Sequence, residues 1–176
     1  MSTELLRAAA FVAYLAALVV VAGAALFGMT RSRGEVSKIS VRGTIGTLLQ
    51  LGAAVLVTRA LPSGALRPQT WELVGMLALA PASAWLFVWA QVPAARSTGG
   101  LVTEGAYAWV RHPMYLAFLG LLVVTGFVVS AGLILLAAVA VYIVGTELRI
   151  TVEEAGLDGY SNYRQSTRWR YFPGLR

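Results

Sequence analysis

The sequence predicts an all-α, polytopic membrane protein with about five transmembrane helices, the last two forming a hairpin that a short cytoplasmic tail follows. Two observations predict it. Of the 176 residues, 58% are hydrophobic and only 12% are charged, whereas an ordinary soluble domain has about 25% charged residues. Long uncharged stretches also divide the chain, and a membrane-spanning helix needs about 20 apolar residues. We therefore expect residues 1–176 to form a single integral membrane domain.

Three uncharged stretches precede Arg96 and correspond to the first three expected spans. They are residues 8–30, 43–58 and 73–95. The middle stretch is short, and it lengthens if the charged end of Arg59 reaches back to the interface. The first stretch is too long for the apolar region of a secretory signal, and Glu4 does not suit the basic segment before such a region. We expect it to be a retained span.

The fourth uncharged stretch, residues 113–146, is long enough to be read in two ways. As one helix it would be about 51 Å long, against a hydrocarbon core of about 30 Å. As two helices it would turn at Ser130, Ala131 and Gly132. Five spans place 11 Lys and Arg residues on one side and 3 on the other, whereas four spans give 8 and 6. The positive-inside rule favours the stronger asymmetry, and hence the hairpin.

This topology puts the N-terminus outside and the C-terminus inside. We expect a bacterial or archaeal cell membrane, with the active site on the cytoplasmic face. The net charge of +6 then marks that face and not a nucleic-acid-binding surface. Gly120, Gly126 and Gly132 recur along the hairpin, where small residues let helix backbones approach closely. We favour packing within the chain over a dimer face, and the oligomeric state stays open.

The composition also limits the chemistry. The chain has no cysteine and one histidine. These counts exclude a disulfide, a thiol nucleophile and an iron–sulfur centre, and they argue against a histidine-rich metal site, so we predict no metal. The polar residues gather in two segments, residues 99–115 and the tail from Glu147, which the hairpin returns to one face. We expect a composite site at the membrane–water boundary.

The first polar segment leads directly into the fourth span. Pro113 suits the first turn of a helix, so Arg111 and His112 precede the positive end of the helix dipole, where a carboxylate is favoured. Tyr115 follows one turn later, and Gly105 allows the backbone to approach a ligand. The alternative is an ordinary basic flank with a belt of interfacial aromatic residues.

The second polar segment contains Glu147, Arg149, Glu153 and Glu154, directly after the last apolar stretch. Arg149 and Glu153 have the i,i+4 spacing of a helical ion pair. These charges either line a polar pocket or form a solvated helix exit that contributes little energy. The aromatic and arginine residues that follow Gly159 also suit a lipid surface, so we assign that part little catalytic weight.

At these residues the sequence resembles the integral membrane methyltransferases that include isoprenylcysteine carboxyl methyltransferase and the phospholipid N-methyltransferases. The first half of the signature is Leu101-Val102-Thr103, Gly105-Ala106-Tyr107 and Arg111-His112-Pro113-Met114-Tyr115. The second half is Glu147-Leu148-Arg149, Glu153-Glu154 and Leu157, followed by Tyr160, Tyr163 and Pro173. Ala117 stands where the family usually has glycine, and the step between Leu157 and Tyr160 is shortened.

The resemblance implies S-adenosylmethionine as the cofactor, S-adenosylhomocysteine as the product and a lipophilic or lipid-linked acceptor from the bilayer. The cofactor-binding residues that it implies are Gln91, Gly100, Leu101, Val102, Tyr107, His112, Pro113, Met114, Tyr115 and Glu153. It also implies that Arg149 lies near the acceptor. Either Arg111 or the adjoining helix N-terminus would bind the carboxylate of the cofactor, so Arg149 and Arg111 are the candidate catalytic residues.

Methyl transfer from a sulfonium is a direct displacement that needs alignment but neither metal nor thiol, which agrees with the composition. Two other functions remain open: an NADPH-dependent membrane sterol or enone reductase, and a non-catalytic membrane scaffold. Such reductases are usually larger, and retention of Arg111, His112, Arg149 and Glu153 argues against a scaffold. The sequence leaves the acceptor open among prenylcysteine, an amine headgroup, a small thiol and a quinone-like or fatty acid carboxylate.

Overall fold

The fold is described from a computed structural model, which covers residues 2–31, 40–59, 68–97 and 100–171. These residues form helices and no β-strand, with one isolated parallel bridge between Val110 and Trp169. The helices are α1 (Thr3–Arg31), α2 (Val41–Thr58), α3 (Thr70–Arg96), the 3-10 helix η2 (Gly105–Ala108), α4 (Pro113–Val128), α5 (Leu133–Gly156) and α6 (Tyr160–Ser166). The all-α prediction is confirmed.

Four helices, α1, α2, α3 and α5, are long and apolar enough to cross a membrane. The fifth apolar helix, α4, has 16 residues and is therefore about 24 Å long, which is less than a full hydrocarbon core. The ambiguous stretch is thus divided into two helices, as the charge asymmetry predicts. The break falls at residues 129–132, where Ser130 and Gly132 have φ of 48° and 54°. These left-handed conformations turn the chain where the sequence predicts it.

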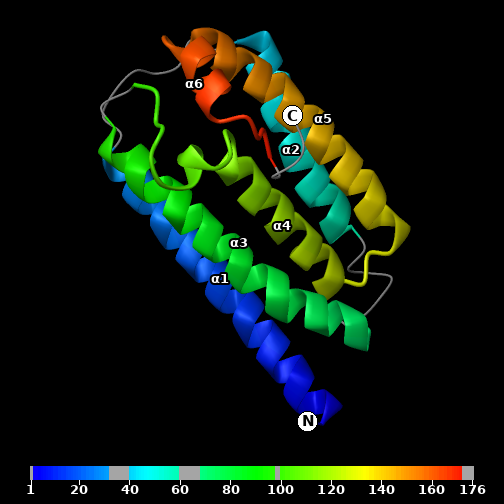
Figure 1. The fold of residues 1–176 in the computed structure, drawn as a ribbon. Coiled ribbons are helices and arrows are strands. Elements are labelled where there is room, and N and C mark those ends of the chain that lie inside the picture. Colours follow the sequence, from blue (N-terminus) through cyan, green and yellow to red (C-terminus); the bar gives the residue numbers. More distant parts are fainter. Residues whose placement is uncertain (1, 32–39, 60–67, 98–99, 172–176) are drawn as a thin grey trace.

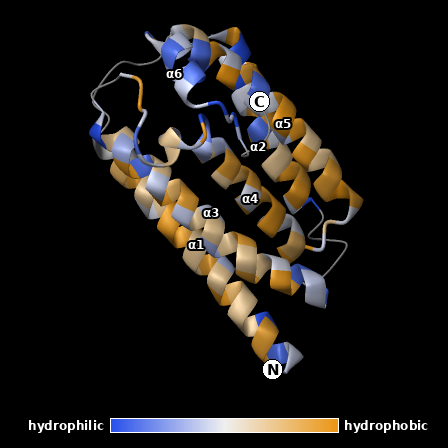
Figure 2. Cartoon of the chain, viewed as in Figure 1, coloured by the Kyte–Doolittle hydropathy of each residue, from blue (hydrophilic) through white to orange (hydrophobic). Residues whose placement is uncertain are grey.

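The helices alternate in direction (Figure 1), so one end of the bundle collects the C-terminal ends of α1, α3 and α5, the N-terminal ends of α2 and α4, and α6. We call this the site end. Hydrophilic residues concentrate there, around α6 and the tail, while the helix surfaces between the ends are mostly hydrophobic (Figure 2). The two polar segments of the sequence therefore meet at one end of the bundle.

The central helix of the bundle is α4. It packs along α3, which in turn packs along α1, while α5 packs mainly along α2. The predicted hairpin of α4 and α5 is present, but these two helices touch each other over a smaller surface than either shares with α3 or α2. The site end therefore draws on both halves of the chain, because α4 and α5 are held there mainly by α3 and α2.

Glycines set the close contacts between helices. A Cβ atom on Gly120 would lie 2.1 Å from Ser83 Oγ, and one on Gly126 would lie 2.5 Å from Leu135 Cδ1. Both glycines therefore serve packing within the chain, as the sequence favours. Gly132 differs, because nothing lies within 4 Å of such a Cβ atom and its φ is positive, so its role is the turn.

Candidate active site

The N-terminus of α4 anchors the site. Pro113 is its first residue and His112 its N-cap, so the missing N–H of proline costs no hydrogen bond. The tail crosses this point beside residues 110–112. The Arg111 N–H donates to the Trp169 carbonyl at 2.9 Å, and the His112 N–H donates to the Arg170 carbonyl at 3.2 Å. The tail is thereby fixed against the start of α4.

The first group of side chains, which we call the closed cluster, consists of His112, Glu154, Tyr160 and Arg170. Glu154 Oε1 accepts a hydrogen bond from the Tyr160 hydroxyl at 2.5 Å. The same oxygen lies 2.9 Å from His112 Nε2 and 3.6 Å from Arg170 Nε. His112 and Tyr160 are buried. One carboxylate oxygen therefore joins α5, α6, the tail and the start of α4.

Burial decides the charge of His112. It lowers the pKa of the imidazole, and the hydrogen bond to Glu154 opposes this effect only in part. The histidine is therefore neutral at neutral pH, with its Nε2 hydrogen donated to the carboxylate. Burial, followed by the hydrogen bond to Glu154, raises the pKa of Tyr160 above its ordinary value. Neither ring is poised to exchange a proton at neutral pH.

The second group, which we call the open cluster, consists of Thr47, Tyr115, Arg149 and Glu153. Glu153 Oε1 accepts from the Tyr115 hydroxyl at 2.5 Å and from Arg149 Nη2 at 3.2 Å. Arg149 Nη1 donates to Thr47 Oγ1 at 3.2 Å, and its guanidinium carbon lies 5.6 Å from the centre of the Tyr115 ring. The Arg149 and Glu153 side chains are 35% and 39% exposed, so both have surface left for a ligand.

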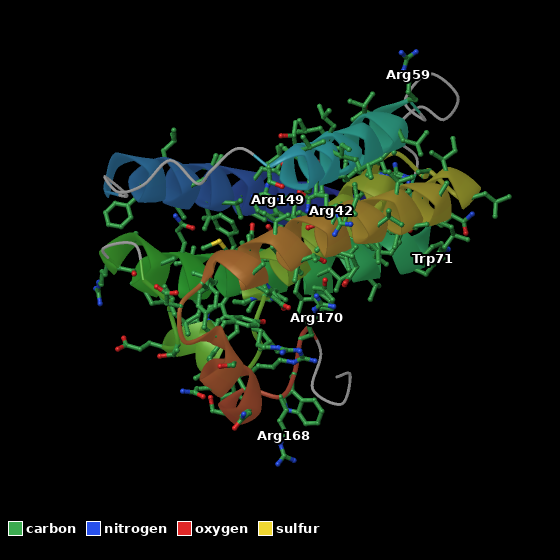
Figure 3. The ribbon with its side chains drawn as sticks, turned by 90° about the horizontal axis from the view of Figure 1, so that it is seen from above. Arg42, Arg59, Trp71, Arg149, Arg168 and Arg170 are labelled. Atoms are coloured by element: carbon green, nitrogen blue, oxygen red, sulfur yellow. The ribbon has the colours of Figure 1, made fainter. Side chains whose placement is uncertain are left out.

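A third carboxylate, Glu147, ties down the tail. It accepts from Arg170 Nη1 at 2.8 Å and from the Tyr171 hydroxyl at 2.5 Å. Arg170 therefore lies against two glutamates of α5. In Figure 3, Arg149 lies between α2 and α5, Arg170 lies on the side of α5 that faces the tail, and Arg168 points away from the bundle. The role of Glu147, which the sequence leaves open, is to hold this segment.

Arg111 is unusual among the cations of the site end. It is only 6% exposed, and its Nε is buried without a hydrogen-bond partner. Within the described residues its guanidinium has neither a hydrogen bond nor an ion pair. Burial raises the pKa of the nearby Tyr160 and Tyr163 hydroxyls, and the charge of Arg111 offsets only part of that rise. An uncompensated buried charge costs several kcal/mol. This position therefore favours an anionic ligand.

The predicted cofactor residues of the loop lie along α3. Leu101 and Val102 line a groove of 740 Å³ with the last turns of that helix, and the Gly100 carbonyl accepts from Ser97 Oγ at 3.2 Å. Gly105 has a φ of 62°, and a Cβ atom there would lie 3.3 Å from the Trp89 carbonyl oxygen. Only glycine suits this close approach of the loop to α3.

The loop then turns toward α4 at Tyr107. The Tyr163 hydroxyl donates to the Tyr107 carbonyl at 2.7 Å, and burial raises the pKa of the Tyr107 phenol. Gln91 is half-buried on α3, one turn beyond Phe87, whose ring lies 5.0 Å from that of Phe118 on α4. Since i and i+4 share a helix face, Gln91 and Phe87 face α4 together. Met114 is half-buried and packs against the core.

The structure thus brings together His112, Tyr115, Arg149 and Glu153, with Arg111 and Pro113 flanking His112 at the start of α4. The contacts of Gly100, Leu101 and Val102 are with the end of α3. Sequence reasoning missed Thr47, which lies in the second apolar stretch. Its polar character, shared with Gln50 one turn later, was the available signal, because polar side chains in a span are costly. It also missed Arg170 and Tyr171, whose interleaved pattern resembles a lipid surface.

Comparison with known proteins assigns the family. Residues 71–158, half of the chain, match the isoprenylcysteine carboxyl methyltransferase (ICMT) family. The chain belongs to this family. ICMT membership makes it a membrane methyltransferase, and members of the family are generally dependent on S-adenosylmethionine. No curated protein and no solved structure matches significantly. The matched region contains both glutamates of the pair and Arg149, but neither α2 nor the residues after 158.

Proposed function

We propose that the chain is an S-adenosylmethionine-dependent methyltransferase that acts on a lipophilic acceptor from the bilayer, in the manner of the ICMT family. The observation that carries this proposal is the unpaired, buried guanidinium of Arg111 beside the α4 N-terminus. A carboxylate there would compensate the charge and use the positive end of the helix dipole. The amino acid moiety of S-adenosylmethionine supplies such a carboxylate.

The amino group, the ribose and the sulfonium of the cofactor would find partners in the open cluster. Glu153 retains exposed carboxylate surface, so it accepts from the amino group or the ribose hydroxyls. The half-buried ring of Tyr115 lies within the same cluster, and an aromatic face favours a nearby cation such as a sulfonium. The remaining residues that we assign to the cofactor are Gln91, Gly100, Leu101, Val102, Tyr107, His112, Pro113 and Met114.

When bound, the cofactor would supply a methyl group on a positively charged sulfur. A bond from the acceptor nucleophile to the methyl carbon would form as the methyl–sulfur bond breaks, with S-adenosylhomocysteine as the leaving group. The residues of the chain then have two tasks. Arg149 uses its remaining N–H groups to hold an anionic or carbonyl oxygen of the acceptor. The closed cluster fixes the start of α4 and the tail, so that the reactive groups keep one relative position; such alignment is a large part of catalysis.

In this proposal the acceptor reaches the site from the bilayer, past the membrane helices. All of residues 1–176 act as one membrane domain in this proposal, and helices α1 to α3 shape the entry of a lipophilic or lipid-linked molecule. The basic residues at the site end favour the cytoplasmic face for the reaction. The chemical class of the accepting atom follows from a direct test, in which purified protein is incubated with labelled methyl donor and total membrane lipid and the labelled species is identified.

The cofactor assignment is tested by ligand-induced stabilisation. S-adenosylhomocysteine is expected to raise the thermal unfolding temperature of the purified protein, because a ligand that binds only the folded state stabilises it. NADPH is expected to leave that temperature unchanged. Stabilisation by NADPH alone would indicate a reductase, and stabilisation by neither would indicate a scaffold.

Arg111→Met locates the site within the protein. We expect at least a tenfold weaker affinity for S-adenosylhomocysteine in calorimetry, because the substitution removes about one charge-assisted hydrogen bond to the ligand. We also expect the ligand-free variant to unfold at an equal or higher temperature, because an apolar residue replaces an unpaired buried charge. Arg168→Met, at an exposed position that points away from the bundle (Figure 3), is the matched control. Unchanged affinity in Arg111→Met would place the carboxylate elsewhere.

A further inference from the structure

Helix α2 reaches the open cluster although it lies outside the region matched to the family. Its Thr47 hydroxyl accepts a hydrogen bond from Arg149 Nη1 at 3.2 Å. One turn later Gln50 Nε2 donates to Thr146 Oγ1 at 2.9 Å. A polar strip of α2 thus faces α5 inside an otherwise apolar span, where polar groups are retained at a cost.

We propose that Thr47 is a positioning residue for the acceptor side of the site: it sets the orientation of the Arg149 guanidinium and so extends the active site to α2. This inference rests on the proposed function, in which Arg149 holds the acceptor. Nothing in the family signature assigns a role to this helix.

The hydroxyl of Thr47 is oriented for this role. It donates its own hydrogen to the Gly43 carbonyl, one turn earlier in α2, at 3.0 Å. A hydroxyl has one hydrogen and two lone pairs, so the oxygen is left to act as an acceptor toward Arg149. Serine preserves this arrangement, whereas valine keeps the shape and removes both hydrogen bonds.

Arg149 is held at three points that come from three helices. Thr47 of α2 accepts from Nη1, Glu153 of α5 accepts from Nη2, and the Tyr115 ring of α4 lies 5.6 Å from the guanidinium carbon. A guanidinium has five N–H donors, so donors remain for a ligand. Without Thr47, the pair with Glu153 on the same helix is left as the principal constraint, and such i,i+4 pairs are weak.

A glycine pair fixes the register between α2 and α5. A Cβ atom on Gly46 would lie 2.5 Å from the Gly145 carbonyl oxygen and 2.7 Å from Arg149 Cγ. A Cβ atom on Gly145 would lie 2.7 Å from the Gly46 carbonyl oxygen. The two backbones therefore touch at this point, and the contact places Thr47 beside Arg149.

The first experiment compares Thr47→Val with Thr44→Val, which alters an exposed threonine of the same helix. The acceptor probe is total membrane lipid supplemented with N-acetyl-S-farnesylcysteine. This mixture is diluted in series while the concentration of labelled methyl donor is kept constant. We expect Thr47→Val to lower kcat/KM for the acceptor mixture about tenfold, typical of a lost hydrogen bond to a charged group. The affinity for S-adenosylhomocysteine and the unfolding temperature should stay near wild type, and Thr47→Ser should restore activity.

The second experiment compares Gly46→Ala with Gly52→Ala. The added methyl group collides with the α5 backbone at residue 46, whereas nothing lies within 4 Å at residue 52. We expect only Gly46→Ala to reproduce the loss in acceptor kcat/KM, accompanied by a lower unfolding temperature. Equal activity of these two variants would overturn the role assigned to the glycine contact.

A kinetic double-mutant cycle separates this inference from the proposed function. In an Arg149→Gln background the effect of Thr47→Val should disappear, because the two residues act as one unit. If wild type binds S-adenosylhomocysteine and methylates the mixture while Thr47→Val behaves like Thr44→Val, the inference is wrong and the proposed function stands. If wild type neither binds nor methylates, the proposed function fails and this inference fails with it.

Discussion

The open and closed clusters differ although Glu153 and Glu154 are neighbours in sequence. Glu154 lies on the face of α5 toward α6 and the tail, and its side chain is 19% exposed. Glu153 lies toward α2 and α4, and its side chain is 39% exposed. Consecutive residues of a helix point about 100° apart. A single pair of acidic residues therefore contributes one carboxylate to each of two environments.

In the proposed function, this difference separates residues that position the site from residues that bind ligands. In the closed cluster one carboxylate oxygen holds two buried rings and one arginine, and buried donors that lack such a partner destabilise the fold. In the open cluster the charged groups keep exposed surface and are linked to a neutral threonine. We expect substitutions in the closed cluster to change stability first and those in the open cluster to change activity first.

The largest effect is expected for the activity of Glu153→Ala. We expect methyl transfer to fall about 100-fold, equivalent to about 2.7 kcal/mol, because the carboxylate that we propose binds the cofactor is removed. The unfolding temperature should change less than in Glu154→Ala: Tyr115 loses its acceptor, but the ion pair with Arg149 is partly exposed and contributes about 1 kcal/mol or less. Initial rates with labelled methyl donor and thermal unfolding in detergent measure the two quantities. Full activity in this variant would remove Glu153 from the site.

Glu154→Ala should show the opposite pattern. It leaves the His112 Nε2 hydrogen and the Tyr160 hydroxyl without their shared acceptor, so we expect a loss of about 2 kcal/mol in unfolding free energy. Denaturant unfolding in detergent, with Glu153→Ala as the matched control, measures this loss. Equal destabilisation by the two substitutions would mean that the clusters do not differ as described.

A smaller effect is expected when single hydroxyls are removed. Tyr160→Phe should cost about 1 kcal/mol of stability, one buried hydrogen bond. Tyr115→Phe should cost less stability, because Glu153 keeps Arg149 as a partner, and should weaken S-adenosylhomocysteine binding instead. Calorimetry and thermal unfolding of both variants provide the comparison, which a larger stability loss in Tyr115→Phe would contradict.

The smallest effect is a pH dependence of the closed cluster. The folded-state pKa of His112 is below its ordinary value of about 6.5, so the unfolded chain takes up a proton that the folded chain does not. Stability should therefore decrease as pH falls below about 6.5, with a slope of at most about 1.4 kcal/mol per pH unit from this residue, and be unaffected by it at higher pH. Unfolding of wild type and His112→Gln between about pH 5.5 and 7 should differ in this slope, and identical slopes would contradict the assignment.

Much of the fold was predictable because its signals are local. The apolar stretches locate the helices, and the excess of basic residues favours the division of residues 113–146 that the structure confirms. The intramolecular role of Gly120 and Gly126 was also favoured correctly. The separation of α4 from α5, with α3 and α2 as their main partners, was not predictable, because apolar helices carry little information about which neighbour they pack against.

Prediction of the site was less complete. The motif residues of α4 and α5 indicate the family, which the comparison confirms, and the structure brings His112, Tyr115 and Glu153 to one end of the bundle. The resemblance assigned Glu153 to the cofactor and left the role of Glu154 open, because the motif gives no contact for it. Thr47 and Arg170 carry no motif, so their contacts depend on helix packing and on the path of the tail.

The sequence by itself determined that the chain lies in a membrane, that its chemistry uses neither thiol nor histidine cluster, and that two segments carry its polar residues, because composition and charge are properties of the chain alone. Tertiary structure alone decided that Arg111 is buried without an ion pair among the described residues, and that Thr47 meets Arg149. Both depend on distances between segments that are far apart in sequence, and helix packing and the turn at residues 129–132 set those distances.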